Sequence, residues 1–130
     1  MQKHLTSLIA ALALLGPGIL WAATPPKPTD PQIAHIAYTA GLLDVEAGKQ
    51  ALEKSQNKDV RAFAQQMIGD HTAVNDQALA LVKKLNVTPE DNPTSQNLTK
   101  QAQATRQKLA GLTGAAFDKA YVDNEVAYHK

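Results

Sequence analysis

This 130-residue sequence offers five candidate ligands for a transition metal, all of them carboxylates or imidazoles. On a helix, steps of seven and eleven residues return to nearly the same angle, so the three candidates near the C-terminus share one face. Carboxylates and imidazoles from facing helices are the groups with which helical bundles hold iron, zinc or copper. A metal-binding protein is therefore one hypothesis for this chain. The five candidate ligands are Glu46, His71, Asp118, Glu125 and His129.

Each candidate also has a purely structural interpretation, which is the more common one for its residue type. A single histidine in an apolar helix face, such as His71, is more often a hydrogen-bonded core group than a ligand. Glu46 lies at the border of an apolar face, where it can pair with a polar neighbour one turn away. Glu125 and His129 are four residues apart, a spacing typical of a surface pair. A further histidine, His35, is expected to be exposed near the start of its helix.

The spacing around the two candidate histidines does not support a ferritin-type diiron centre. Such a centre requires two Glu-x-x-His pairs. Ile68 and Val126 stand three residues before His71 and His129, so neither pair is present. Phosphate loops, dinucleotide fingerprints and the Gly-x-Ser-x-Gly motif are also absent from the sequence. We therefore assign no catalytic residue and expect a protein that is not an enzyme.

The composition excludes several classes of function. Cysteine is absent, which excludes disulfides, thiolate metal sites, cysteine nucleophiles and a lipid anchor on cysteine. The sequence has 13 basic and 12 acidic side chains, a net charge of +1, so we expect no nucleic-acid partner. The polar faces mix both signs of charge, which does not favour binding to a membrane surface.

Residues 1–22 have the pattern of a secretory signal peptide. Lys3 gives a positive start, an apolar stretch follows, and small residues then suit cleavage, preferably after Ala22 rather than Ala23. An uncleaved anchor is the alternative, although a membrane span needs roughly 20 apolar residues without such interruptions. Removing Lys3 with this segment leaves 12 basic and 12 acidic side chains, so the mature chain is neutral. We expect a periplasmic or secreted protein.

Four helical segments are predicted after a proline-rich linker at residues 23–30. Asp30 is the expected N-cap of the first helix, because Pro31 suits the first helical turn. Asn57 and Thr113 are the expected N-caps of the second and fourth helices. No segment shows the alternating pattern of a strand, so we predict an all-α, antiparallel helical bundle over residues 31–130. The predicted helices are residues 31–55, residues 58–85, a third helix from Thr94 or Ser95 to Leu112, and residues 114–130.

The second helical segment shows the clearest apolar repeat, with steps that alternate between four and three residues. This spacing is typical of a helix packed at a shallow angle in a bundle. It predicts that Met67 and Val74 are buried, with His71 between them. The repeat consists of Val60, Ala64, Met67, His71, Val74, Ala78, Leu81 and Leu85. The inward faces predicted for the first, third and fourth segments are Ile33, Ile36, Ala40, Leu43, Ala47 and Ala51; Leu98, Ala102, Thr105, Leu109 and Leu112; and Phe117, Tyr121, Asn124 and Tyr128.

Three stretches form a recognisable set: residues 41–49, residues 60–72 with Met67-Ile-Gly-Asp-His71, and residues 117–123. Together they resemble a family of secreted bacterial proteins known as domain of unknown function 4142, from about Asp30 to the last residue. The resemblance implies a ferritin-like helical bundle and a periplasmic or outer-membrane protein without an assigned activity. Family members continue past the segment that matches His129 and add one further helix with another histidine. The resemblance therefore implies a fourth helix that is cut short and an apolar face that is left uncovered.

We expect an exported cell-envelope protein that acts through helix–helix interaction. Its partner would be a second copy of the chain or another envelope protein, bound through the uncovered apolar face. Association with the outer membrane would come from such partners rather than from lipid. The competing hypothesis is a metal-binding or metal-dependent redox protein of the ferritin-like type, with iron, zinc or copper as its cofactor.

Overall fold

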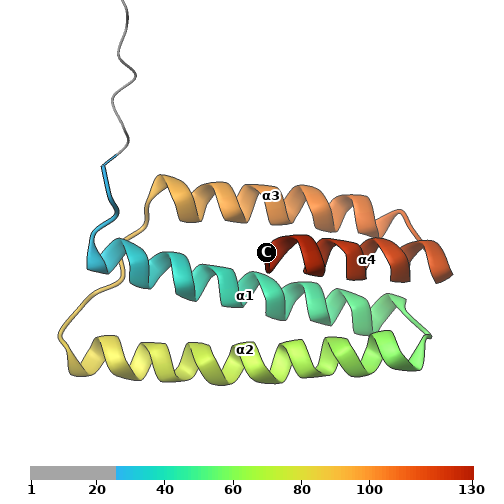
Figure 1. Cartoon of the computed structure of the whole chain (residues 1–130), viewed down its shortest axis with the longest axis horizontal. Helices are drawn as coiled ribbons and strands as arrows, with labels where there is room; N and C mark the ends of the chain where they lie inside the picture. The colour runs from blue at the N-terminus through green and yellow to red at the C-terminus, as the bar shows by residue number, and fades with distance from the viewer. Residues whose placement is uncertain (1–25) are drawn as a thin grey trace, which may run out of the picture.

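The fold is seen in a computed structural model that describes residues 26–130, so the signal peptide predicted at residues 1–22 lies outside the described residues. Within this part the chain forms helices and no strands, which confirms the predicted all-α helical bundle. None of these helices combines the length and the hydropathy that a membrane span requires. The helices are α1 (Asp30–Lys54), α2 (Lys58–Lys84), α3 (Pro93–Ala110) and α4 (Gly114–Tyr128), shown in Figure 1.

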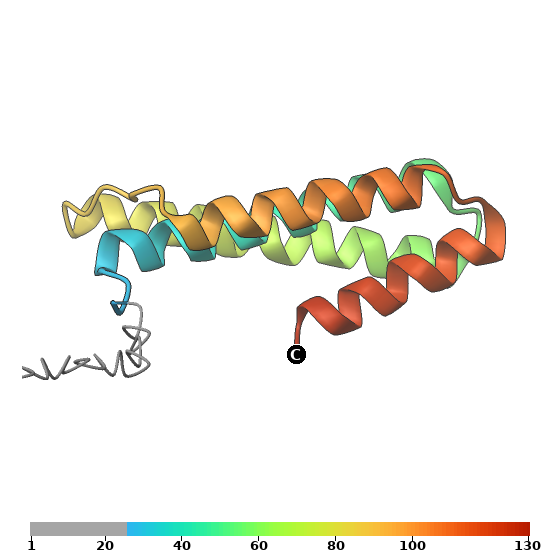
Figure 2. The same cartoon turned by 90° about the horizontal axis from the view of Figure 1, so that it is seen from above.

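Helix α1 is the central element of the bundle. It lies side by side with α2 and α3, and α4 packs over one face of the layer that these three helices form (Figures 1 and 2). α4 extends over only the half of α1 that is nearer the α1 C-terminus (Figure 1). The end of α4 therefore lies beside the middle of α1, where the candidate site is found.

The capping residues agree only in part with the prediction. Thr29, not Asp30, is the N-cap of α1, because its side chain accepts a hydrogen bond from the backbone N–H of Gln32. Asp30 lies in the first turn instead, where a negative charge favours the helix dipole. Asn57 caps α2 as predicted. Thr113 occupies the N-cap position of α4, but its side chain makes no capping hydrogen bond.

The helix ends agree with the prediction to within two residues. α3 begins at Pro93, earlier than predicted, because the side chain of Asn92 accepts hydrogen bonds from the first free N–H groups of the helix. It ends at Ala110 rather than Leu112. α4 ends at Tyr128, so His129 is its C-cap residue and lies just outside the helix.

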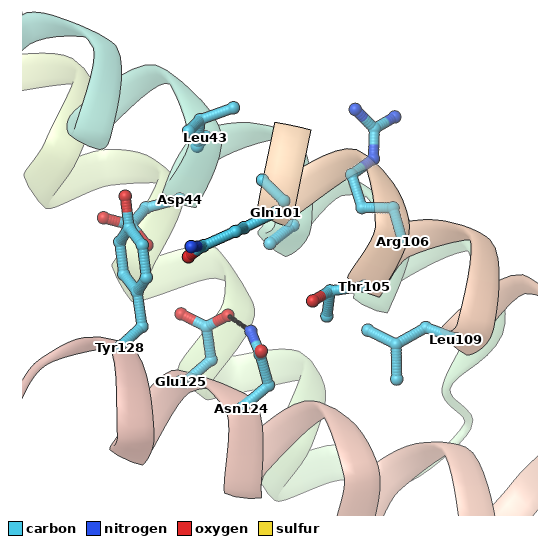
Figure 3. Close-up of a pocket in the computed structure, with 11 residues that line it drawn as sticks. Leu43, Asp44, Gln101, Thr105, Arg106, Leu109, Asn124, Glu125 and Tyr128 are labelled. Carbon is cyan, nitrogen blue, oxygen red and sulfur yellow. Dashed lines mark hydrogen bonds between the residues drawn. The ribbon is translucent and has the colours of Figure 1, made fainter. Parts of the chain in front are cut away.

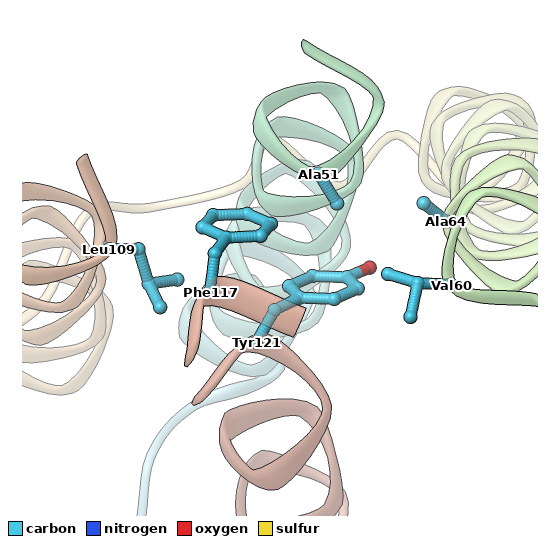
Figure 4. Packing of buried hydrophobic residues seen from close by; sticks show 6 residues of the cluster. All are labelled: Ala51, Val60, Ala64, Leu109, Phe117 and Tyr121. Atoms are coloured by element: carbon cyan, nitrogen blue, oxygen red, sulfur yellow. The ribbon is translucent and has the colours of Figure 1, made fainter. Parts of the chain in front are cut away.

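The hydrophobic core lies where α4 begins, between all four helices. Phe117 and Tyr121 of α4 are fully buried, and their rings stack with centroids 6.1 Å apart. Burial of the Phe117 side chain contributes roughly 1.5–3 kcal/mol. This packing fixes the first half of α4 and thereby carries its second half into place over α1. The other members of the core cluster are Ala51, Val60, Ala64 and Leu109 (Figure 4).

Helices α1 and α2 approach closely because α1 presents glycines to α2. A Cβ atom at Gly48 would lie 2.8 Å from Cγ1 of Ile68 and 3.0 Å from a backbone carbonyl oxygen of α2. A Cβ atom at Gly41 would overlap the side-chain amide of Asn75. Asp44 lies between these glycines, three residues after one and four before the other. The close approach therefore brings its carboxylate next to α2.

We expect Gly48→Ala to lower the free energy of unfolding by about 1–3 kcal/mol, because the added methyl group overpacks the contact with α2. Gly69→Ala is the matched control, since Gly69 is also inside a helix but a Cβ atom there meets nothing within 4 Å beyond the backbone of its own helix and its chain neighbours. The control should raise the free energy of unfolding by about 0.5–1 kcal/mol, because alanine is the better helix former. Urea unfolding followed by circular dichroism measures both changes. Equal effects of the two substitutions would contradict the close packing.

The predicted burial of the whole apolar repeat of α2 is wrong in its C-terminal half. Val74 is 58% exposed and Leu81 is 55% exposed, whereas Asn75 is buried and Met67 is half-buried. A repeat of 3.5 residues drifts by about 20° per heptad against a helix of 3.6 residues per turn. Relative to Val60, the repeat has therefore turned by roughly 40° at Val74 and 60° at Leu81. No part of α4 extends over this half of the bundle, so the turned side chains stay exposed (Figure 1).

Candidate metal site

Three side chains of metal-ligand type meet where α4 ends beside α1 and α2. Asp44, His71 and His129 each offer one ligand atom, and these atoms lie within 4.8 Å of one another. Oδ2 of Asp44 is 3.4 Å from Nε2 of His71 and 3.7 Å from Nε2 of His129. The three residues belong to α1, α2 and the C-cap of α4, so the cluster exists only in the folded chain.

The His129 ring is held by a hydrogen bond that decides which of its nitrogens is free. Nδ1 of His129 lies 2.8 Å from the backbone carbonyl oxygen of Glu125. A carbonyl oxygen can only accept, so Nδ1 carries the hydrogen and donates it, which leaves a lone pair on Nε2 of the neutral ring. Metal-binding histidines commonly make this second hydrogen bond to a backbone carbonyl. His129 is therefore oriented to offer Nε2 toward Asp44.

Asp44 is the shared partner of both histidines and is almost fully buried. Its residue is 4% exposed, because the glycine face of α1 lies close against α2. Burial raises the pKa of Asp44 above its ordinary value, while His71 and His129 act in the opposite direction. An ionised carboxylate at this position needs a positive partner, since burying an uncompensated charge is strongly unfavourable.

Glu125 places a second buried carboxyl group beside the cluster. It is 2% exposed, and Oε2 has no hydrogen-bond partner among residues 26–130. Burial, followed by the nearby charge of Asp44, raises the pKa of Glu125 to about 7. Glu125 and Asp44 line a cavity of about 90 Å³ together with Gln101 and Thr105 (Figure 3). Glu125 is thus a buried carboxyl group beside the cluster and not one of its three members.

Two of the predicted ligands lie away from this cluster. Glu46 forms an ion pair with Arg106 of α3 and is half exposed. It follows Asp44 by two residues, about 200° around the helix, so the two carboxylates point to opposite sides of α1. Asp118 lies two turns before Glu125, about 10 Å away along α4. Neither Glu46 nor Asp118 joins the group that the structure brings together.

The structural interpretations of the other candidates also change. Glu125 and His129 are not a surface pair, because Glu125 is buried and His129 uses its ring to bond the Glu125 backbone. His71 is neither enclosed in an apolar core nor on an open polar surface, since its side chain is 25% exposed and faces Asp44. The prediction that His35 is exposed is wrong, because its side chain is 28% exposed and Nδ1 lies 2.9 Å from Oγ of Ser95.

Asp44 is the cluster member that the sequence analysis missed. The signal for it is a carboxylate flanked by Leu43 and Val45, directly after the apolar residues 40–43. It also shares a helix face with Gly41 and Gly48, and small residues on one face predict a close neighbouring helix. Reading the glycines as the buried face would have placed Asp44, rather than Glu46, in the interior.

Comparison with known protein families gives a match over most of the chain. The model of the family described as Domain of unknown function (DUF4142) matches residues 20–130. No curated protein and no solved structure matches the sequence. The family description assigns no activity.

Proposed function

We propose that this chain, which belongs to the family described as Domain of unknown function (DUF4142), is a metal-binding protein with Asp44, His71 and His129 as ligands. The observation that supports the proposal most is that two atoms able to accept a hydrogen bond or a cation, Oδ2 of Asp44 and Nε2 of His129, face each other. When the His129 ring is neutral, its hydrogen is on Nδ1, and Nε2 then presents a lone pair toward the carboxylate, 3.7 Å away. A cation at this point satisfies both groups.

The ligand set is suited to zinc, copper or iron. Two imidazole nitrogens and one carboxylate oxygen are donors that these metals share. Zinc binds such donors at about 2.0–2.2 Å, which places tetrahedral ligand atoms roughly 3.3 Å apart. The two separations from Oδ2 of Asp44, 3.4 Å and 3.7 Å, are close to this spacing. Small rotations of the two histidine rings would bring all three atoms to one ion.

Elemental analysis and calorimetric titration test this proposal. The mature protein is stripped with a chelator and titrated separately with zinc, copper and ferrous iron. We expect about one equivalent of at least one of these metals to bind per chain. Less than about a tenth of an equivalent, with all three metals offered, would contradict the proposal.

We also propose that the protein works in the cell envelope, in the periplasm or outside the cell. This proposal is supported by the signal-peptide pattern of residues 1–22. Mass spectrometry of the protein recovered from a periplasmic fraction tests it. A mature N-terminus at Ala23 is expected, and a chain that retains Met1 would contradict export with cleavage.

A second candidate function is helix-mediated association between two copies of the chain. A hollow of about 320 Å³ lies between the start of α1 and the end of α2. Ile33, Leu81 and Leu85 line it and are 50%, 55% and 61% exposed. Ile33 was predicted to face inward, but α4 does not extend over this part of α1 (Figure 1). Exposed leucines next to a hollow suit a two-fold pairing, in which each copy fills the hollow of the other.

We expect the protein to sediment as a dimer at micromolar concentration, and the double substitution Leu81→Lys, Leu85→Lys to make it a monomer. Charged side chains in the hollow would have to be buried without a partner, which strongly disfavours association. Val126→Lys is the control, because Val126 is 50% exposed on α4 and outside the hollow. Sedimentation velocity measures the three proteins. A wild-type monomer, or a dimer that survives the double substitution, would contradict this candidate.

A further inference from the structure

Helices α2 and α4 run in the same direction and contact each other through two pairs of rings (Figure 1). The ring centroids of Phe63 and Tyr121 are 6.1 Å apart, and those of His71 and His129 are 5.6 Å apart. The two contacts are separated by the same number of residues along both segments, so α2 and α4 stay in register between them. The residue of α2 that lies halfway between the two contacts is Met67.

Met67 faces α4 one turn before the candidate ligand His71. It follows Phe63 by four residues and precedes His71 by four, and each such step turns a side chain by about 40° around the helix. The Met67 side chain therefore leaves α2 in a direction between those of two rings that both contact α4. Met67 is half-buried, which agrees with this position.

A thioether at this position adds a donor of a different chemical class to the candidate site. Side chains four residues apart are neighbours on a helix surface, with Cβ atoms about 5–6 Å apart. The three rotatable bonds of Met67 let its sulfur approach the metal bound by His71. Thioether sulfur is a soft ligand that selects copper(I), whereas imidazole binds zinc, copper and iron alike. Met67 is therefore the neighbour that would distinguish copper(I) from the other metals.

The sequence makes this sulfur atom unique. Cysteine is absent, and the two methionines are Met1 and Met67. Met1 lies in the predicted signal peptide, so the sequence from Ala23 to Lys130 contains one sulfur atom. That atom belongs to the residue one turn from His71. Any sulfur found on a metal bound to the mature chain would therefore come from Met67.

We infer that the site is selective for copper(I), with Met67 as a thioether ligand beside the imidazoles of His71 and His129. The inference rests on the proposed metal-binding function. It goes beyond that function because it names the metal ion and adds a ligand to the set. Asp44 supplies the negative charge that balances copper(I), since the imidazoles and the thioether are neutral donors.

The test measures the affinities of the mature protein and of Met67→Leu for copper(I) and for zinc, without oxygen, by competition with a chromophoric chelator. Leucine fills a similar volume without sulfur, so the cost in folding free energy should be below about 1.5 kcal/mol. We expect the copper(I) affinity to fall by at least about 10-fold, which is the smaller effect of losing a group that only supports a ligand. The zinc affinity should stay the same. Zinc is the control, because disturbed packing would weaken the binding of both metals.

X-ray absorption at the copper edge identifies the ligands directly. The wild type should show scattering from one sulfur atom and from imidazole rings, and Met67→Leu should lose only the sulfur. Zinc binding without copper(I) binding, copper(I) without a sulfur ligand, an unchanged copper(I) affinity in Met67→Leu, or equal losses for both metals would each overturn the inference and leave metal binding in place. A wild type that binds neither these metals nor ferrous iron would contradict the proposed function as well.

Discussion

His71→Ala should lower the affinity of the protein for zinc by more than about 100-fold. Changes to groups that merely orient a metal ligand reduce affinity by about 10- to 100-fold, and the loss of a ligand has a larger effect. His71 supplies one of only two imidazoles in the cluster and is the only member on α2. Competition with a chromophoric chelator measures the dissociation constants. We expect the substitution to leave the helix content unchanged, because the His71 side chain is partly exposed.

The chain offers a matched control for each ligand type. His35→Ala removes an imidazole that is equally half-buried but contacts Ser95, far from the cluster, and it should retain the zinc affinity. Asp44→Asn should lower the affinity strongly, whereas Glu46→Gln should not, because Glu46 pairs with Arg106 on the opposite side of α1. If His71→Ala and His35→Ala had the same effect, the bound metal would not be held by the cluster described above.

Glu125→Gln should change how the stability of the metal-free protein depends on pH. Burial and the charge of Asp44 raise the pKa of Glu125 to about 7, from an ordinary value of 4.5. The folded state therefore holds this proton more tightly than the unfolded chain does. The resulting stabilisation is fully present below about pH 4.5 and is lost as the pH rises through about 7. A shift of this size corresponds to about 3 kcal/mol of unfolding free energy.

The glutamine variant remains neutral, so it should escape this loss and become more stable than the wild type as the pH rises. At about pH 5 the two proteins should differ little, and at about pH 8 the variant should be more stable by up to about 3 kcal/mol. Asp44, whose pKa burial also raises, adds a loss of the same sign to both proteins. Urea unfolding in the presence of a chelator measures the difference. Parallel pH profiles for the two proteins would contradict the buried, protonated state of Glu125.

The sequence was sufficient to predict the helices, because their signals are local. Asn57 and the prolines near the helix starts mark where helices begin, and the spacing of Phe117 and Tyr121 marks the face of α4 that forms the core. The face of α1 was predicted less well, because larger aliphatic residues such as Ile33 were taken as its interior. The closest contact is instead made at Gly41 and Gly48, which are buried because α2 packs against them without a side chain between the helices. Only the three-dimensional pairing shows this.

The candidate site could be predicted only in part, because the buried face of α1 was assigned wrongly. His71, Glu125 and His129 stand out by type and spacing, and the structure brings all three near the middle of α1. Asp44 was missed because the predicted face of α1 was turned away from the glycines. Glu46 was named in its place because a helix position two residues away lies on nearly the opposite side. The direction of one helix face therefore decided which carboxylate was assigned to the site.

X-ray absorption at the zinc edge of the loaded protein tests the central claim most directly. We predict a spectrum with two imidazole ligands, seen from the outer-shell scattering of the rings, and oxygen or nitrogen donors at about 2.0–2.2 Å. His71→Ala should leave one imidazole in any zinc that still binds. A first shell of oxygen atoms without imidazole scattering would contradict the assignment of Asp44, His71 and His129 as a metal site.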